Sequence, residues 1–185
     1  MSTRRFFFHC LIALSLSSAA PAHADEHPSY ENLDSPYCAA LGQLHSGFND
    51  DFKSLKDTLY DAGQDLKVWS SKVVLPGAKR CDIWQTDAGI TLSCEIASAA
   101  SGEEGEKIFR EHRENIERCL GKDWVRGETA LAAPDEGFRF LANNPVTGAK
   151  VQLEAKKTGE DAKHSVELAL LHEAPPSAAE TPPEK

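Results

Sequence analysis

Apolar side chains recur at steps of three and four residues in two segments of the chain, which is the spacing of an amphipathic helix. The first segment runs from Cys38 to Tyr60, with Gly63 as a suitable terminator. The second runs from about Gly102 to Leu120. Ser101 is placed to cap its first turn, and a glycine follows its end. We therefore predict one helix in each segment.

Alternating apolar and polar residues predict strands in most of the remaining chain. Residues 67–75 form the first, and two strands flank a turn centred on Asp87-Ala88. Residues 124–128 resemble a short strand, and three longer alternating segments follow around Phe140, Leu153 and Leu168. The order α-βββ-α-βββ indicates loose duplication of a helix-plus-three-strand unit. We predict an α+β fold, with an antiparallel sheet of about six strands and both helices on one face.

The chain divides into four parts. Residues 1–24 have a basic start with Arg4 and Arg5, a short apolar stretch and an Ala-His-Ala cleavage site, which together indicate a secretory signal peptide. Residues 25–36 read as an extended arm, and residues 37–173 as a single α+β domain. Residues 174–185 hold four prolines among small and acidic residues, which predicts a disordered tail.

The two arginines and the phenylalanines after them resemble the twin-arginine export motif. The cysteines favour the general secretory route instead, because a chain that is oxidised after export crosses the membrane more readily unfolded. We expect a soluble periplasmic or secreted protein with no transmembrane segment in the mature chain.

The chain is acidic, with a net charge of −9 that becomes −11 when Arg4 and Arg5 leave with the signal peptide. This charge argues against nucleic acid and anionic membrane surfaces as partners, because both require clustered Lys and Arg. It is compatible with a basic partner.

Four cysteines remain after removal of Cys10 with the signal peptide. An even number in an exported chain indicates two disulfides. The hairpin around Asp87-Ala88 places Cys81 opposite Cys94 on one strand face, within disulfide reach. We therefore predict Cys81–Cys94, which leaves Cys38–Cys119.

A Cys38–Cys119 bond between antiparallel helices would bring His45 opposite His112 along a shared seam. The same register would place Leu41 against Ile116 and Phe48 against Phe109. Two imidazoles on one face could perform acid–base chemistry or hold a metal, although a metal site usually needs a third ligand. We expect both histidines to be structural, and retain them as weak catalytic candidates for a periplasmic hydrolase.

Two further sites are suggested by position. Signal cleavage after Ala24 would put His27 third from a free amine, which is a Cu(II) or Ni(II) binding arrangement. The hairpin pattern puts Trp84 and Asp82 on its solvent face, and a lone exposed Trp often anchors a partner.

Sequence motifs for enzymes are absent: the chain has no nucleophile elbow, phosphate-binding glycine loop or dinucleotide fingerprint. We expect no cofactor. The sequence favours an exported binding, inhibitor or adaptor domain that acts on a protein or envelope ligand. The alternatives are a hydrolase using histidine and carboxylate groups, and an N-terminal Cu(II)/Ni(II)-binding protein.

Overall fold

The structure is a computed structural model that describes residues 30–63, 65–131, 137–158 and 163–172. The expected signal peptide, His27 and the proline-rich tail lie outside these residues. The helices are α1 (Pro36–Ser46), a one-turn 3-10 helix η1 (Gly47–Asp50) and α2 (Gly102–Cys119). The strands are β1 (Lys56–Ala62), β2 (Leu66–Ser71), β3 (Arg80–Thr86), β4 (Gly89–Ala99), β5 (Val125–Ala130), β6 (Gly137–Asn143), β7 (Ala149–Thr158) and β8 (Lys163–His172).

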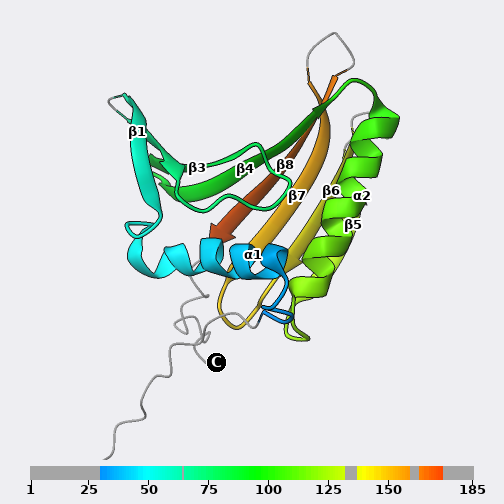
Figure 1. The fold of residues 1–185 in the computed structure, drawn as a ribbon, viewed down its shortest axis with the longest axis horizontal. Coiled ribbons are helices and arrows are strands. Elements are labelled where there is room, and N and C mark those ends of the chain that lie inside the picture. The colour runs from blue at the N-terminus through cyan, green and yellow to red at the C-terminus, as the bar shows by residue number, and fades with distance from the viewer. Residues whose placement is uncertain (1–29, 64, 132–136, 159–162, 173–185) are drawn as a thin grey trace, which may run out of the picture.

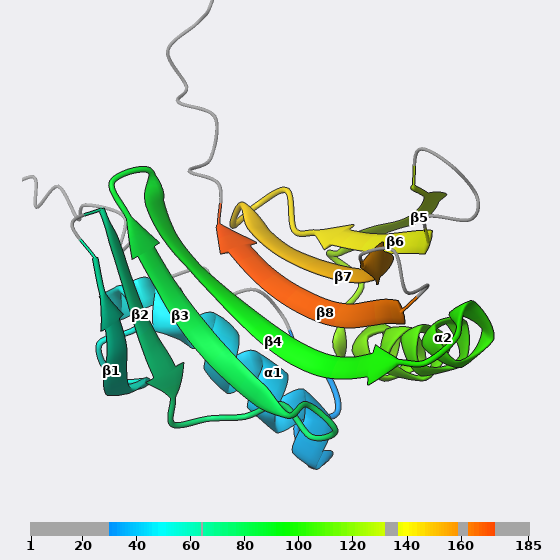
Figure 2. The same ribbon diagram turned by 90° about the horizontal axis from the view of Figure 1, so that it is seen from above.

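The described strands form one antiparallel sheet in the order β1-β2-β3-β4-β8-β7-β6-β5. Each half of the sheet is a four-stranded meander preceded by a helix, and the halves meet where β4 pairs with β8 (Figures 1 and 2). The α+β class is therefore confirmed. The expected count of about six strands is corrected to eight, and the order α-βββ-α-βββ to α-ββββ-α-ββββ.

The extra strand of the first half lies inside the segment predicted as a helix. That helix ends at Ser46 and the chain enters β1 at Lys56. A β-carbon on Gly47 would lie 2.4 Å from the Phe52 ring, so glycine lets that ring pack against the helix end. Asp51 and Phe52 both have left-handed backbone conformations, which break the helical path. Phe52 is fully buried although the helix has ended, so the apolar spacing continued by coincidence.

The register predicted for the central hairpin is confirmed, with Cys81 opposite Cys94 and Ile83 opposite Leu92. These four side chains are buried on the helix-covered face of the sheet. Side chains of alternate parity lie on the opposite, outer face, which neither helix covers (Figure 2).

Helix α2 begins and ends where the sequence predicted, to within one residue. The Ser101 side chain accepts a hydrogen bond from the Glu104 amide, and the Glu104 carboxylate accepts one from the Ala100 amide. Its buried face comprises Gly105, Phe109, His112, Ile116 and Cys119. These pack in one core cluster with the buried face of α1, so both helices cover the same side of the sheet.

Both predicted disulfides are confirmed, Cys38–Cys119 and Cys81–Cys94. The predicted seam between the two helices, with His45 opposite His112 and Phe48 opposite Phe109, is not observed. The helices are joined at the disulfide and diverge from it across the sheet (Figure 1). The Phe48 ring meets Phe52 edge to face and the Phe109 ring lies against Phe138, so these two rings have aromatic partners other than those the seam predicted. No helix among the described residues is long and apolar enough to cross a membrane.

Candidate binding groove

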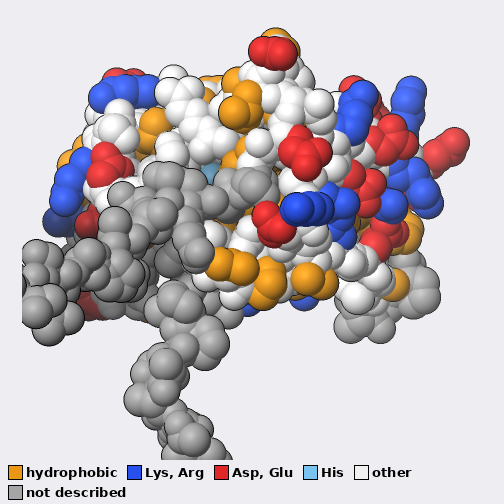
Figure 3. Space-filling view, turned by 90° about the horizontal axis from the view of Figure 1, so that it is seen from below, with side chains coloured by type: hydrophobic (Ala, Val, Ile, Leu, Met, Phe, Trp, Pro, Cys, Tyr) orange, Lys and Arg blue, Asp and Glu red, His pale blue; other side chains and the backbone are white. Residues whose placement is uncertain are grey.

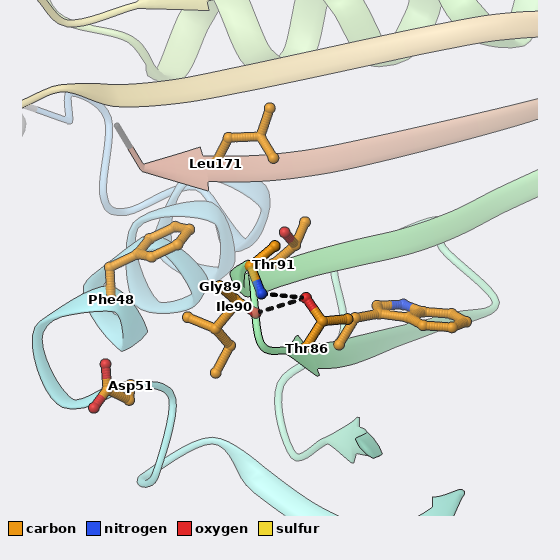
Figure 4. A pocket seen from close by; sticks show the side chains of 9 residues that line it. Phe48, Asp51, Thr86, Gly89, Ile90, Thr91 and Leu171 are labelled. Atoms are coloured by element: carbon orange, nitrogen blue, oxygen red, sulfur yellow. Dashed lines mark hydrogen bonds between the residues drawn. The ribbon is translucent and has the colours of Figure 1, made fainter. Parts of the chain in front are cut away.

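The turn end of the β3–β4 hairpin forms one side of a groove with a volume of about 440 Å³. The other side comes from the end of the first helical segment and from the last residues of β8 (Figure 4). The lining side chains are Phe48, Asp51, Trp84, Thr86, Ala88, Gly89, Ile90, Thr91 and Leu171. We call this site the hairpin groove.

The groove lies at one end of strands β3, β4 and β8 and reaches both faces of the sheet. Ile90 has the parity of the core face, whereas Trp84, Thr91 and Leu171 have the parity of the outer face. Phe48, Ile90 and Leu171 come from three separate elements that line the groove (Figure 4). The result is a solvent-accessible depression lined by both apolar and polar side chains.

The lengths of the two helices explain why the depression lies at this end. Helix α2 has 18 residues and spans about 27 Å, whereas α1 has 11 and spans about 16 Å. The chain turns away at Asp51 after the short η1 segment. The helical layer therefore ends at Asp50, and Phe48 lies in its last turn, where it lines the groove.

The hairpin wall is fixed by its turn. The Thr86 hydroxyl accepts a hydrogen bond from the Ala88 amide and donates one to the Gly89 carbonyl, at 3.2 and 3.4 Å (Figure 4). Gly89 has φ of 142°, which glycine adopts without strain. The apolar side chains of the wall are thus held on a rigid scaffold.

Trp84 is the largest exposed aromatic surface at the groove. Its exposed fraction is 38%, whereas Trp124 is buried and Trp69 is partly buried beneath the ammonium group of Lys56. The outer-face position predicted for Trp84 is therefore the observed one.

Asp82 shares this face but is only 5% exposed. The Arg80 guanidinium lies 3.3 Å from its carboxylate. Burial is the main cause that raises the pKa of Tyr60 above its ordinary value, and a hydrogen bond to Asp82 raises this pKa further. Asp82 thus joins β1 to β3 beside Trp84 and supports this surface from within.

Carboxylates occur on both walls of the groove. Asp51 lines the helical end with a largely exposed side chain, Asp50 precedes it in the chain, and Asp87 lies in the hairpin turn between Thr86 and Ala88. Burial alone would raise the pKa of Asp50, but hydrogen bonds from Ser54 and Lys53 outweigh it and hold that pKa below its usual value. The Asp51 carboxylate is 3.8 Å from the Lys53 ammonium, and both side chains are more than two-thirds exposed. Such an exposed pair neutralises little charge.

The two candidate catalytic histidines are buried, and neither lines the groove. His45 is hydrogen-bonded through Nδ1 to the Tyr30 hydroxyl, and its ring packs against Phe48 and Trp124. His112 is hydrogen-bonded through Nδ1 to the Tyr37 hydroxyl at 3.1 Å. Burial lowers the pKa of His112, which keeps its ring neutral near pH 7. The structure places the two imidazoles in separate aromatic clusters, as structural histidines would be.

No group of three or more His, Cys, Asp or Glu side chains within the described ranges could hold a metal ion. His27 lies outside those ranges, so the N-terminal Cu(II)/Ni(II) site stays a prediction. A second hollow of about 480 Å³ lies along α2, but it is lined only by charged side chains of that one helix. Figure 3 shows positive and negative side chains interspersed on the side of the molecule that carries α2, as on a solvated helix face.

Sequence reasoning identified Trp84 but not the groove beside it. Phe48 and Leu171 belong to elements far apart in sequence, and no periodic pattern links them. The only indication of this site in the sequence was the strand alternation that places Trp84 on the polar face of the hairpin. No protein-family model, curated protein or solved structure matches this chain, so its own residues carry the functional argument.

Proposed function

We propose that this protein is an exported binding domain that captures a protein partner in the hairpin groove, as an inhibitor or adaptor would. The observation that carries the proposal is Trp84, a 38% exposed aromatic side chain among the residues that line a preformed groove. Rigid aromatic anchors at such positions contribute much of the binding energy in protein interfaces.

Three further features support a binding role. The groove is formed by side chains that are already fixed, since the hairpin turn and the buried Asp82 hold its outer wall. A preformed site loses little conformational entropy on binding. Two buried disulfides, including one that joins the helices, suit a domain that must stay folded in an oxidising compartment outside the cytoplasm.

The test is selection of peptides from a random displayed library on the immobilised mature chain. Peptides that bind the wild type should bind Trp84→Ala at least about tenfold more weakly. Val125→Ala is the matched control, because Val125 is an exposed apolar residue at the far edge strand β5. Urea unfolding should show that both variants are as stable as the wild type within about 0.5 kcal/mol. The proposal is wrong if no peptide is enriched, or if the enriched peptides bind Trp84→Ala with unchanged affinity.

A further inference from the structure

We infer that the partner segment bound in the hairpin groove carries a bulky apolar side chain followed closely by a Lys or Arg residue. This inference rests on the proposed function and specifies the chemistry of its ligand. The apolar part of the argument comes from the groove walls and the basic part from the charges around its helical end.

The walls favour a bulky apolar side chain. Phe48 and Ile90 line the groove from the core side of the sheet, and Leu171 lines it from the outer side. All three are partly exposed in the free protein. An apolar side chain that covers them removes apolar surface from water on both partners, which is the main favourable term in association.

The rim favours a cation at one end. The carboxylate of Asp51 lines the groove next to Phe48, and Asp50 and Asp87 add negative charge nearby. Lys53 is the cation paired with Asp51, but a pair this exposed is readily exchanged for another. On the sheet side, Lys150 lies opposite Leu171 on the neighbouring strand, so the helical end is the negative end. The net charge of −9 adds long-range attraction for a basic partner.

The chain's own tail fits this groove poorly, although it follows β8 just after Leu171. Residues 173–185 contain three glutamates against one lysine and no bulky apolar side chain. Like charges across the negative end would oppose its binding. The proposed ligand of the hairpin groove is therefore a segment of another protein.

The experiment uses the mature full-length chain and short fluorescent peptides, measured by anisotropy at low salt. The peptides share one apolar anchor, Leu, Phe or Trp, and differ at a neighbouring position that holds Lys, Gln or Glu. The Lys peptides should bind about fivefold more tightly than the Gln peptides and more tightly still than the Glu peptides. This preference should shrink at high salt, because rim charges are screened.

Asp51→Asn is the informative variant. Asn tolerates the left-handed backbone found at this position, with φ of 55°, so the substitution removes charge while keeping the turn. The Lys-over-Gln preference should fall below about twofold in this variant. Asp34→Asn is the matched control, because it removes one exposed carboxylate before the opposite end of α1 and should leave the preference unchanged. Lys53→Gln removes the competing cation and should tighten binding of the Lys peptides.

The outcomes separate this inference from the proposed function. Binding that depends on Trp84 but is indifferent to Lys, Gln or Glu would overturn the basic-partner inference and leave the binding groove intact. A Lys preference that survives Asp51→Asn would also overturn it. Stronger binding to a chain truncated after His172 would show that the tail competes for the groove, which contradicts the assigned occupant. Absence of any Trp84-dependent binding would overturn both.

Discussion

A β-carbon placed on Gly137 would lie 1.8 Å from the carbonyl oxygen of Ala155, on the strand that pairs with it. No side chain fits at that distance, and the φ of 129° at Gly137 is also unfavourable for other residues. This close approach of two backbones fixes the start of β6 against β7, so the position has room only for glycine.

We expect Gly137→Ala to lower the free energy of unfolding by about 3 kcal/mol or more, because it combines a backbone clash with a strained conformation. Gly89→Ala is the control. Its φ is 142°, but a β-carbon there would meet nothing within 4 Å, so we expect a loss of about 1 kcal/mol. Urea unfolding of both variants measures the difference. Equal losses would show that the clash at Gly137 has no energetic effect.

The stability of the protein should depend on pH through His112. Burial holds its pKa below the ordinary value of about 6.5, outweighing the opposite effect of Glu111. The unfolded chain therefore binds more protons than the folded chain once the pH falls below about 6.5. The free energy of unfolding should be fully retained above that pH and should fall below it, by at most about 1.4 kcal/mol per pH unit.

Urea unfolding between about pH 7.5 and about pH 5 tests this dependence. His112→Gln leaves a side-chain amide to bond the Tyr37 hydroxyl and removes the titrating group, so its curve should be flatter than that of the wild type. Parallel curves for the two proteins would exclude His112 as the source of the acid sensitivity.

The two disulfides should differ in their contribution to stability. Cys38–Cys119 closes a loop of 81 residues and Cys81–Cys94 one of 13. Loop entropy predicts stabilisation of about 4.5 kcal/mol for the first and about 3 kcal/mol for the second. Cys38→Ala/Cys119→Ala should therefore unfold at a lower urea concentration than Cys81→Ala/Cys94→Ala. All four cysteines are buried, which makes the two double variants comparable. The reverse order would show that local packing, and not loop length, sets the difference.

The support that Asp82 gives to the groove surface can be measured through Tyr60. Burial raises the pKa of all three tyrosines in the chain, and it does so most strongly for Tyr30 and Tyr37. Tyr60 should therefore be the first to ionise in an alkaline titration followed by phenolate absorbance. Asp82→Asn should shift this first transition to lower pH, because the negative charge that opposes the phenolate is gone. The assignment fails if Tyr60→Phe retains the first transition.

Much of the fold could be predicted because its signals are local. The cap at Ser101 and the hairpin around Asp87-Ala88 each depend on residues close in sequence, and both are confirmed. The Cys38–Cys119 bond followed once the hairpin had paired the other two cysteines.

One error comes from a local break that the apolar spacing does not reveal. Leu41, Leu44, Phe48 and Phe52 have helical spacing, yet α1 ends at Ser46, where Phe52 packs against Gly47 and Asp51 and Phe52 have left-handed backbones. Leu59, which the helix predicted for residues 38–60 would include, is 46% exposed on the edge strand β1. The groove could not be predicted for a different reason, since its walls come from segments far apart in the chain.

The order of the cysteines along the chain constrains how this protein matures. The bonds are nested, since the Cys81–Cys94 loop lies wholly inside the span of Cys38–Cys119. If the protein is exported from its N-terminus, as proposed, Cys38 and then Cys81 would reach the oxidising compartment before either native partner has emerged. Pairing in order of emergence would then join the wrong sulfurs. Native pairing would in that case require either that Cys38 stays reduced until Cys119 arrives, or that an isomerase exchanges the first bond formed.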